Sequence, residues 1–256
     1  MIFVFDLDGT ICFDGVRIPA VIKTALLRLQ QKHQLIFASA RPIRDLLPRL
    51  DDRLNTAILI GGNGSITRAE QQITARNYLS PADFSQLKQW IEQLDLDYLA
   101  DDIWHYSKRI RRPHDIEHKI DAARLAENRP LSAIRQPIKL ILLNLTEPHY
   151  RFLRENLPRL NINLIEHSNS NGLYNIDITA KHINKYTTLN KLIGSQPYIA
   201  FGNDMNDIEL LNHAKHAICV GNFAPLQAVA DSVLAAIPET IAEKISLLTD
   251  KTALAK

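Results

Sequence analysis

Short apolar runs and amphipathic stretches alternate along the first part of the chain. Residues 2–5, 34–38 and 56–60 form apolar runs of strand length, and the last of these ends at Gly61-Gly62. Between the first two runs, apolar residues recur at helical spacing: Val21, Ile22, Ala25, Leu26 and Leu29. Buried strands separated by helices are typical of βαβ units, so this segment is predicted to build a parallel sheet.

The same alternation returns towards the end of the chain. Helices are predicted at residues 185–193, 207–211 and 238–248, and strands at residues 198–201 and 216–220. The two ends of the chain therefore share one α/β pattern.

The middle of the chain follows a different pattern. Residues 70–79 are polar and strand-like, residues 81–94 and 116–126 are predicted helices, residues 137–145 favour a strand, and residues 172–179 alternate. We interpret this segment as a mixed α+β unit inserted into an α/β domain, with boundaries near residues 77 and 183.

Composition excludes several classes of partner. The 256 residues include 30 Lys and Arg against 28 Asp and Glu, a net charge of +2, so no general attraction to nucleic acid or to an anionic membrane is expected. Cys12 and Cys219 lie too far apart in sequence to suggest a disulfide framework or a zinc site. No apolar run approaches the roughly 20 residues of a membrane helix. A cytoplasmic protein is expected.

Two carboxylates stand directly after the first predicted strand, in Asp6-Leu7-Asp8-Gly9-Thr10. Open parallel sheets bind ligands beyond the carboxyl ends of their strands. Two acids held this close repel each other and recruit a cation. One of them could attack phosphorus as a nucleophile, while the other protonates the leaving oxygen and later accepts a proton from water. An ordinary Asp-Gly turn would leave Asp6 unexplained.

The segment from Asp6 to Thr10 resembles the first motif of the haloacid dehalogenase superfamily. Four further segments follow in the order of that family: Ser39, Asn63-Gly64, Lys185 and Gly202-Asn203-Asp204-Met205-Asn206-Asp207. Asn63-Gly64 is similar to the Asn-Gly of the Cof-type phosphatases, and the insert lies where their cap belongs. The resemblance implies an α/β fold: a Rossmann-like parallel-sheet core, residues 1–77 and 183–256, with an inserted α+β cap domain, residues 78–182.

The resemblance also implies catalytic roles. Asp6 is expected to be the nucleophile and Asp8 the general acid and base, and an acid at position 8 favours phosphate-ester hydrolysis over dehalogenation. Ser39 and Lys185 are expected to bind the phosphate. Asn206 is expected to donate to the phosphate or to order Lys185.

A Mg²⁺ cofactor is implied at the same place. Its expected ligands are Asp6, the backbone carbonyl of Asp8 and Asn203, with Asp207 holding a metal-bound water. Asn203 stands where the family usually has an aspartate, so one negative charge is lost. Asp204 is the alternative ligand, and the sequence does not decide between the two.

Four residues are candidates for contacts with the substrate or the cap: Arg41, Asn63, Gly64 and Lys139. Lys139 stands in an apolar run, where an unpaired lysine is costly to bury, so we expect it to face the active site of the core. Asn63-Gly64 is equally well explained as a turn.

A basic run also lies in the insert: Lys108, Arg109, Arg111 and Arg112. It could recognise an anionic leaving group, although such runs are more often solvated faces, which is the interpretation preferred here.

The leading hypothesis is a Mg²⁺-dependent phosphatase that hydrolyses small phosphorylated metabolites, typically sugar phosphates, through an aspartyl-phosphate. A hexose phosphomutase is one alternative. A phosphometabolite-sensing protein with low turnover is another, and Asn203 keeps it open. A nucleotide-driven kinase is disfavoured because the chain has no Gly-x-x-x-x-Gly-Lys-Ser/Thr loop. The sequence leaves the substrate and the oligomeric state open.

Overall fold

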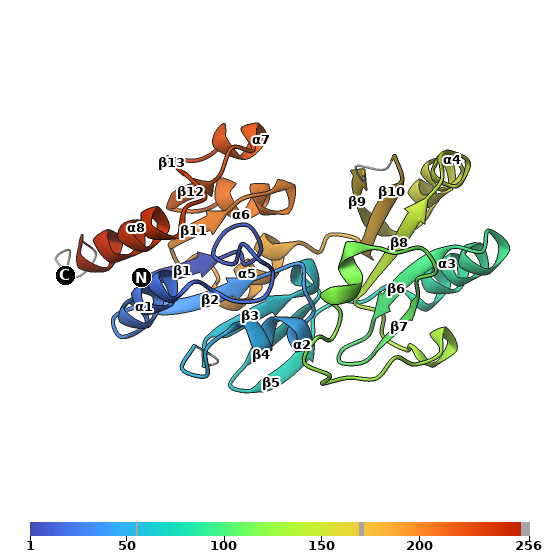
Figure 1. Ribbon diagram of the computed structural model, residues 1–256, viewed down its shortest axis with the longest axis horizontal. Helices are drawn as coiled ribbons and strands as arrows, with labels where there is room; N and C mark the ends of the chain where they lie inside the picture. Colours follow the sequence, from blue (N-terminus) through green and yellow to red (C-terminus); the bar gives the residue numbers. More distant parts are fainter. Residues whose placement is uncertain (55, 169–171, 252–256) are drawn as a thin grey trace. The chain divides into compact units, whose positions relative to one another are not determined.

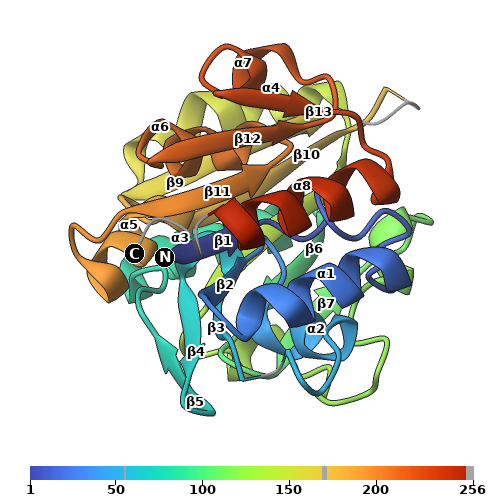
Figure 2. The ribbon, with the colours of Figure 1, turned by 90° about the vertical axis from the view of Figure 1, so that its left-hand side faces the viewer.

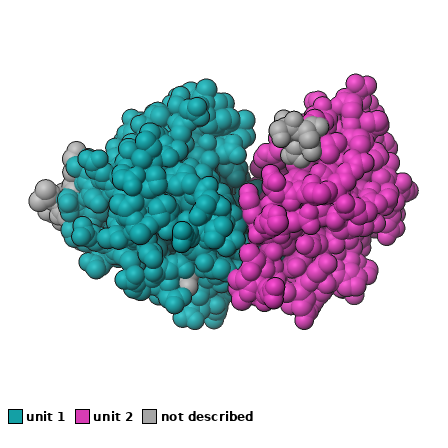
Figure 3. Space-filling model, in the orientation of Figure 1, with its two compact units in different colours: residues 1–73, 184–256 teal, residues 74–183 magenta. Residues whose placement is uncertain are grey.

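The computed structural model describes residues 1–54, 56–168 and 172–251. The chain divides into two compact units (Figure 3). The first comprises Met1–Ile73 and Asn184–Lys256, and the second comprises Thr74–Ile183. We call the first the core unit and the second the cap unit. No helix in the described part of the chain is long and apolar enough to cross a membrane.

The core unit is built on an eight-stranded sheet (Figure 1). In sheet order its strands are β13 (Ser232–Leu234), β12 (His216–Val220), β11 (Tyr198–Gly202), β1 (Ile2–Phe5), β2 (Gln34–Ala38), β3 (Ile58–Gly61), β4 (Ile66–Ala69) and β5 (Gln72–Ala75). All neighbours from β13 to β3 pair in parallel, and β4 runs antiparallel to β3. The fold class expected from the sequence is confirmed.

Helices cover this sheet. They are α1 (Ala20–Gln30), α2 (Ile43–Leu46), α5 (Lys185–Ile193), α6 (Ile208–Asn212), α7 (Ala224–Gln227) and α8 (Pro238–Lys251). Helices α1 and α8 lie side by side, as Figure 2 shows. In β1 successive side chains point to opposite faces, so Ile2 and Val4 pack with α5 and α6 while Phe5 stacks on Phe201 at 4.7 Å between ring centroids.

This topology gathers the predicted motifs. Strands β11, β1, β2 and β3 are adjacent and parallel, so their carboxyl ends lie along one edge of the sheet. Asp6 follows β1, Ser39 follows β2, Asn63 follows β3 and Asn203 follows β11. Segments far apart in the sequence are thereby brought together.

In its described residues, the cap unit has an antiparallel sheet of five strands and two α-helices. The strands are, in sheet order, β7 (Tyr106–Arg109), β6 (Asp97–Asp101), β8 (Lys139–Leu145), β10 (Tyr174–Ala180) and β9 (Ile162–Ser168), and the helices are α3 (Pro81–Gln93) and α4 (Glu147–Asn156). Both helices contribute to one apolar cluster on a single face of the sheet, which includes Trp90, Leu142, Leu153 and Ile176. Leu99, Ile141 and Leu143 form a second cluster on the other face.

The helix predicted for residues 116–126 is wrong. Only a short 3-10 turn, Asp115–His118, forms there. The carboxylate of Asp121 accepts the backbone N–H groups of Leu125 and Ala126 at 2.6 and 3.0 Å. Asp121 and Arg124 also adopt positive φ angles of 44° and 55°. A side chain that captures nearby backbone donors competes with helical hydrogen bonds, and left-handed residues interrupt the helix.

Lys139 has a partner inside the cap unit. Its Nζ lies 2.6 Å from Oδ2 of Asp177 on the neighbouring strand β10, and both side chains are largely buried. This ion pair by itself accounts for a buried lysine in an apolar strand. The argument that pointed Lys139 towards the active site therefore does not hold, because its burial needs no further partner.

Candidate active site

A buried lysine joins two carboxylates at the edge of the core sheet. Lys185 lies in the first turn of α5, and its Nζ is 2.5 Å from Oδ1 of Asp6 and 2.7 Å from Oδ1 of Asp207. Asp6 is 5% exposed, and the other two are completely buried. The helix begins at Asn184, whose side chain accepts the N–H of Thr187 at 2.7 Å, so the lysine stands on a well-capped helix start.

The charges of this cluster do not cancel. Burial raises the pKa of Asp6 to about 7, and the neighbouring carboxylate of Asp207 adds to the rise. Burial alone would lower the pKa of Lys185, but Asp207 and Asp6 more than offset it, so its pKa is raised and it stays protonated. With both acids ionised, two negative charges face one positive charge. The cluster therefore favours a further cation beside Asp6.

Oxygen atoms suited to a hard cation converge beside Asp6. The end of the Asn203 side chain lies 3.0 Å from Oγ1 of Thr10, 2.9 Å from the carbonyl oxygen of Asp8 and 3.0 Å from Oδ2 of Asp6. With its amide nitrogen there, Asn203 donates to these atoms. With its oxygen there, and with the hydroxyl hydrogen of Thr10 donated to Asp6, it completes a set of carboxylate, carbonyl and amide oxygens. Those are the donors that Mg²⁺ prefers, so the residues fit this metal.

Gly9 allows this approach. It has a φ of 80°, and a Cβ at this position would lie 2.2 Å from Nδ2 of Asn203. Only glycine therefore leaves room for Asn203 beside the two acids.

The structure separates the roles of Asn203, Asp204 and Asp207. Asp204 is exposed and its carboxylate accepts the N–H of Met205 at 2.7 Å, which leaves Asn203 as the residue against Asp6. Oδ2 of Asp207 accepts the N–H groups of Asn203 and Asp204 at 3.0 and 3.3 Å, and its other oxygen binds Lys185. Asp207 thus holds the lysine and the loop, and its expected contact with a metal-bound water stays a prediction.

Asp8 has a different environment from Asp6. Its two oxygens accept hydrogen bonds from Nε and Nη2 of Arg41, both at 2.6 Å. The side chain of Asp8 is 42% exposed, whereas that of Arg41 is 9% exposed. A bidentate arginine fixes the plane of a carboxylate as well as its position. Arg41 is therefore placed to orient Asp8, a contact that the sequence analysis did not identify.

Ser39 and Asn63 present polar groups at the ends of β2 and β3. Oγ of Ser39 accepts the N–H of Arg41 at 3.1 Å, and its hydroxyl hydrogen has no acceptor among the described residues, so it can be donated to a ligand. Oδ1 of Asn63 accepts from Nδ2 of Asn206 at 3.0 Å. Asn206 therefore contacts Asn63, and Lys185 is ordered by the two carboxylates instead. Nδ2 of Asn63 is buried and has no hydrogen-bond partner in the described part of the chain.

Gly64 has a structural task. Its φ is 108°, and a Cβ there would lie 2.3 Å from the backbone oxygen of Asn184. Its own carbonyl oxygen accepts from Thr188 at 2.6 Å. The Asn63-Gly64 turn is thus packed against the start of α5, which positions Asn63 and Lys185 relative to each other.

Thr10 is a site residue to which the sequence analysis gave no role. It is completely buried, and its hydroxyl donates to Oδ2 of Asp6 at 2.9 Å. Its place four residues after Asp6, within the first motif, was the available signal. The two oxygens of Asp6 are thus oriented by different groups, Lys185 on one and Thr10 on the other.

A sequence model of one protein family matches residues 3–240, and its description is haloacid dehalogenase-like hydrolase. This match confirms the resemblance that the five motifs indicated.

Individual proteins are similar over nearly the same length. The 5-amino-6-(5-phospho-D-ribitylamino)uracil phosphatase YitU of Bacillus subtilis (strain 168) is 24% identical over 237 residues, 85% of each chain. The crystal structure of a haloacid dehalogenase-like hydrolase from Bacteroides thetaiotaomicron has a TM-score of 0.81 at 20% identity, covering 96% of this chain and 98% of that one. The HAD subclass IIB sugar phosphatase BT4131 has a TM-score of 0.73 at 20% identity and covers 99% of both chains.

Proposed function

The chain belongs to the haloacid dehalogenase-like hydrolases, and from that premise we propose that it is a Mg²⁺-dependent phosphatase of small phosphorylated metabolites, with sugar phosphates as its substrate class. The observation that carries the proposal is the contrast between its two acids. Asp6 is buried and bound to Lys185, and Asp8 is half-exposed and bound to Arg41. Two carboxylates in such different environments suit two different roles.

Asp6 acts as the nucleophile. One of its oxygens forms a bond to phosphorus while the bond from phosphorus to the leaving oxygen breaks, and Asp8 gives that oxygen a proton. Asp8 then takes a proton from a water molecule, whose oxygen attacks phosphorus and releases Asp6. Mg²⁺, held by Asp6, Asp8 and Asn203, would neutralise charge on the phosphoryl oxygens.

The remaining side chains bind and orient. Lys185 supplies a positive charge beside Asp6, and the hydroxyl of Ser39 is free to donate to a phosphate oxygen. The unpartnered Nδ2 of Asn63 is a further donor at this edge. The substrate class is supported by two similar proteins, one a sugar phosphatase and the other a phosphatase of a 5-phospho-D-ribityl compound.

A cytoplasmic location is part of the proposal. Cys12 and Cys219 are free and buried, and burial together with Asp8 raises the pKa of Cys12 to about 11. Unreactive, unpaired thiols suit a reducing compartment.

The test is phosphate release from p-nitrophenyl phosphate and a panel of sugar phosphates, measured with Mg²⁺ and with EDTA. We expect turnover of both kinds of ester with Mg²⁺, and at least about a hundredfold less with EDTA, since metal charge stabilisation is worth several kcal/mol. Binding of a phosphate analogue without turnover of any ester would contradict the proposal and favour a mutase or a sensor.

Arg41 is expected to act on catalysis through Asp8. Arg41→Lys removes the bidentate contact, so the proton donor is less well oriented. We expect kcat for sugar phosphates to fall about 10- to 100-fold, with a smaller loss for p-nitrophenyl phosphate, whose leaving group needs little protonation. Arg17→Lys, at an exposed arginine paired with Asp14, is the matched control. Equal losses for both esters would show that Arg41 does not work through Asp8.

A further inference from the structure

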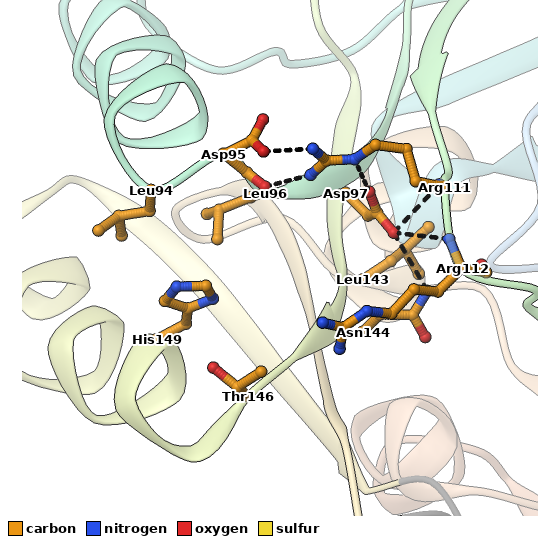
Figure 4. A pocket seen from close by; sticks show the side chains of 10 residues that line it. All are labelled: Leu94, Asp95, Leu96, Asp97, Arg111, Arg112, Leu143, Asn144, Thr146 and His149. Carbon is orange, nitrogen blue, oxygen red and sulfur yellow. Dashed lines mark hydrogen bonds and ion pairs between the residues drawn. The ribbon is translucent and has the colours of Figure 1, made fainter.

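The cap unit contains a pocket of about 350 Å³ that has no role in the proposed reaction (Figure 4). It lies where β6 begins, at Asp97, and where β8 ends, at Leu143 and Asn144. The chain enters and leaves the cap unit at the other end of this sheet. There the backbone N–H of Leu79 donates a hydrogen bond to the carbonyl oxygen of Pro137, just before β8. Ile183 follows the end of β10 at the same end of the sheet. The length of β8 thus separates the pocket from both connections to the core unit.

The acids of this pocket are already neutralised. Arg111 binds both Asp95 and Asp97, the latter at 3.0 Å, and Arg109 lies 3.4 Å from Asp95. These arginines belong to the basic run that the sequence analysis interpreted as a solvated face. Two of its members are in fact engaged in ion pairs. The positive charge of Arg112, the next residue of the same run, is not balanced by either of these acids.

Arg112 is fixed at its backbone and free at its head group. Its N–H donates to Asp97 at 3.3 Å, and its carbonyl oxygen accepts from Nδ2 of Asn144 at 3.1 Å. Figure 4 shows its guanidinium extending towards Thr146 and His149. Within residues 1–54, 56–168 and 172–251, none of these three side chains has a hydrogen-bond or ion-pair partner. Arg112 is exposed, so its guanidinium is open to a ligand from solvent.

The side of the pocket formed by the start of α4 adds further groups that can donate hydrogen bonds to an anion. Thr146 is the N-cap of the ten-residue helix α4, and its side chain makes no cap hydrogen bond. His149 lies in the first turn of that helix. A guanidinium, a hydroxyl, an imidazole and a helix N-terminus all favour a negatively charged group. Leu94, which is partly exposed, supplies apolar wall, and the volume suits a small molecule.

We propose that this pocket is a second binding site, specific for a small anionic metabolite whose phosphate or carboxylate group is held by Arg112, Thr146 and His149. The side chain of Leu94 receives the apolar part of that molecule. The residues of this site belong to the cap unit, whereas those of the catalytic cluster around Asp6 belong to the core unit, and the proposal does not depend on the proposed reaction.

The test observes the imidazole signals of His149 by NMR while the full-length protein is titrated with inorganic phosphate and, separately, with malonate. Because His149 lines the pocket, its signal reports on an anion bound there, and the Arg112→Gln variant separates this binding from phosphate bound near Asp6. We expect a saturable shift with at least one probe, and the probe that acts identifies the anion class. Arg112→Gln and Thr146→Val should each weaken that binding, the former by about tenfold or more, because a charge-assisted hydrogen bond is lost.

Arg135→Gln is the matched control. Arg135 is an exposed arginine of the cap unit that does not line the pocket, so this substitution removes the same charge and should leave the titration unchanged. The absence of a saturable shift with either probe would overturn the proposal. Binding to Arg112→Gln as tight as to the wild type would overturn it as well.

Discussion

Asp6→Asn is expected to reduce phosphate release by at least about 10³-fold, as loss of a nucleophile does in other enzymes that form covalent intermediates. Asparagine has the same size, and its amide oxygen can still accept from Lys185, so the fold should persist. Initial rates with saturating Mg²⁺ measure the effect. Asp14→Asn, at an exposed carboxylate in the following loop, removes the same charge and should leave the rate within about twofold. A rate for Asp6→Asn within tenfold of the wild type would exclude Asp6 as the nucleophile.

The same variant, Asp6→Asn, measures how much the buried carboxylate of Asp6 destabilises the folded protein. The pKa of Asp6 is raised from 3.8 to about 7, so the folded, metal-free protein binds this proton more tightly than the unfolded chain. Its contribution to stability is present below pH 3.8 and is lost as the pH rises through about 7. In EDTA, the Tm of Asp6→Asn should therefore gain on that of the wild type as the pH rises through this window. A difference in Tm between the two proteins that stays constant with pH would contradict the raised pKa of Asp6.

Lys185→Met is expected to damage both stability and activity. It leaves Asp6 and Asp207 facing each other without their ammonium partner, in a place from which water is excluded. Removing one partner of a buried ion pair costs about 3–5 kcal/mol, which corresponds to a fall in Tm of about 10 °C for a chain of this size. Activity should fall about 10²–10³-fold, because the positive charge beside the phosphate is lost.

Two controls separate these effects. Lys191→Met alters an exposed lysine on the same helix and should change neither property. The double variant Lys185→Met with Asp207→Asn removes one of the stranded charges, so it should recover much of the Tm but none of the activity. Recovery of activity in the double variant would contradict a catalytic contribution from Lys185.

The strands of the core unit could be predicted from the sequence because they are buried on both faces of the sheet. Ile2 to Phe5 and Tyr198 to Phe201 are continuous apolar runs, and β1 and β11 do pair in parallel. The cap was harder to predict because its strands carry buried charges. Asp97 and Asp101 are buried beside Leu99 in β6, so no simple polar alternation marks this strand. Between residues 116 and 126 the apolar spacing was helical, but one carboxylate, Asp121, captured the backbone donors.

At the site, the sequence indicated which residues meet, but not their pairing. The motif order brought Asp6, Lys185 and Asp207 to one edge of the sheet. That Lys185 would bridge the two carboxylates, and that Arg41 would hold Asp8 through two hydrogen bonds, depends on side-chain directions. Tertiary packing sets these side-chain directions, so the spacing of residues in a single sequence does not predict them.

The central claim is that the reaction passes through a phosphorylated Asp6, and the most direct measurement is to trap that state. The wild type would be mixed with a sugar phosphate and Mg²⁺, quenched with acid during turnover, digested, and its peptides analysed by mass spectrometry. The account predicts one added phosphoryl group on the peptide that contains Asp6, absent in Asp6→Asn. Steady turnover with phosphate carried on another residue, or an active Asp6→Asn variant, would contradict it.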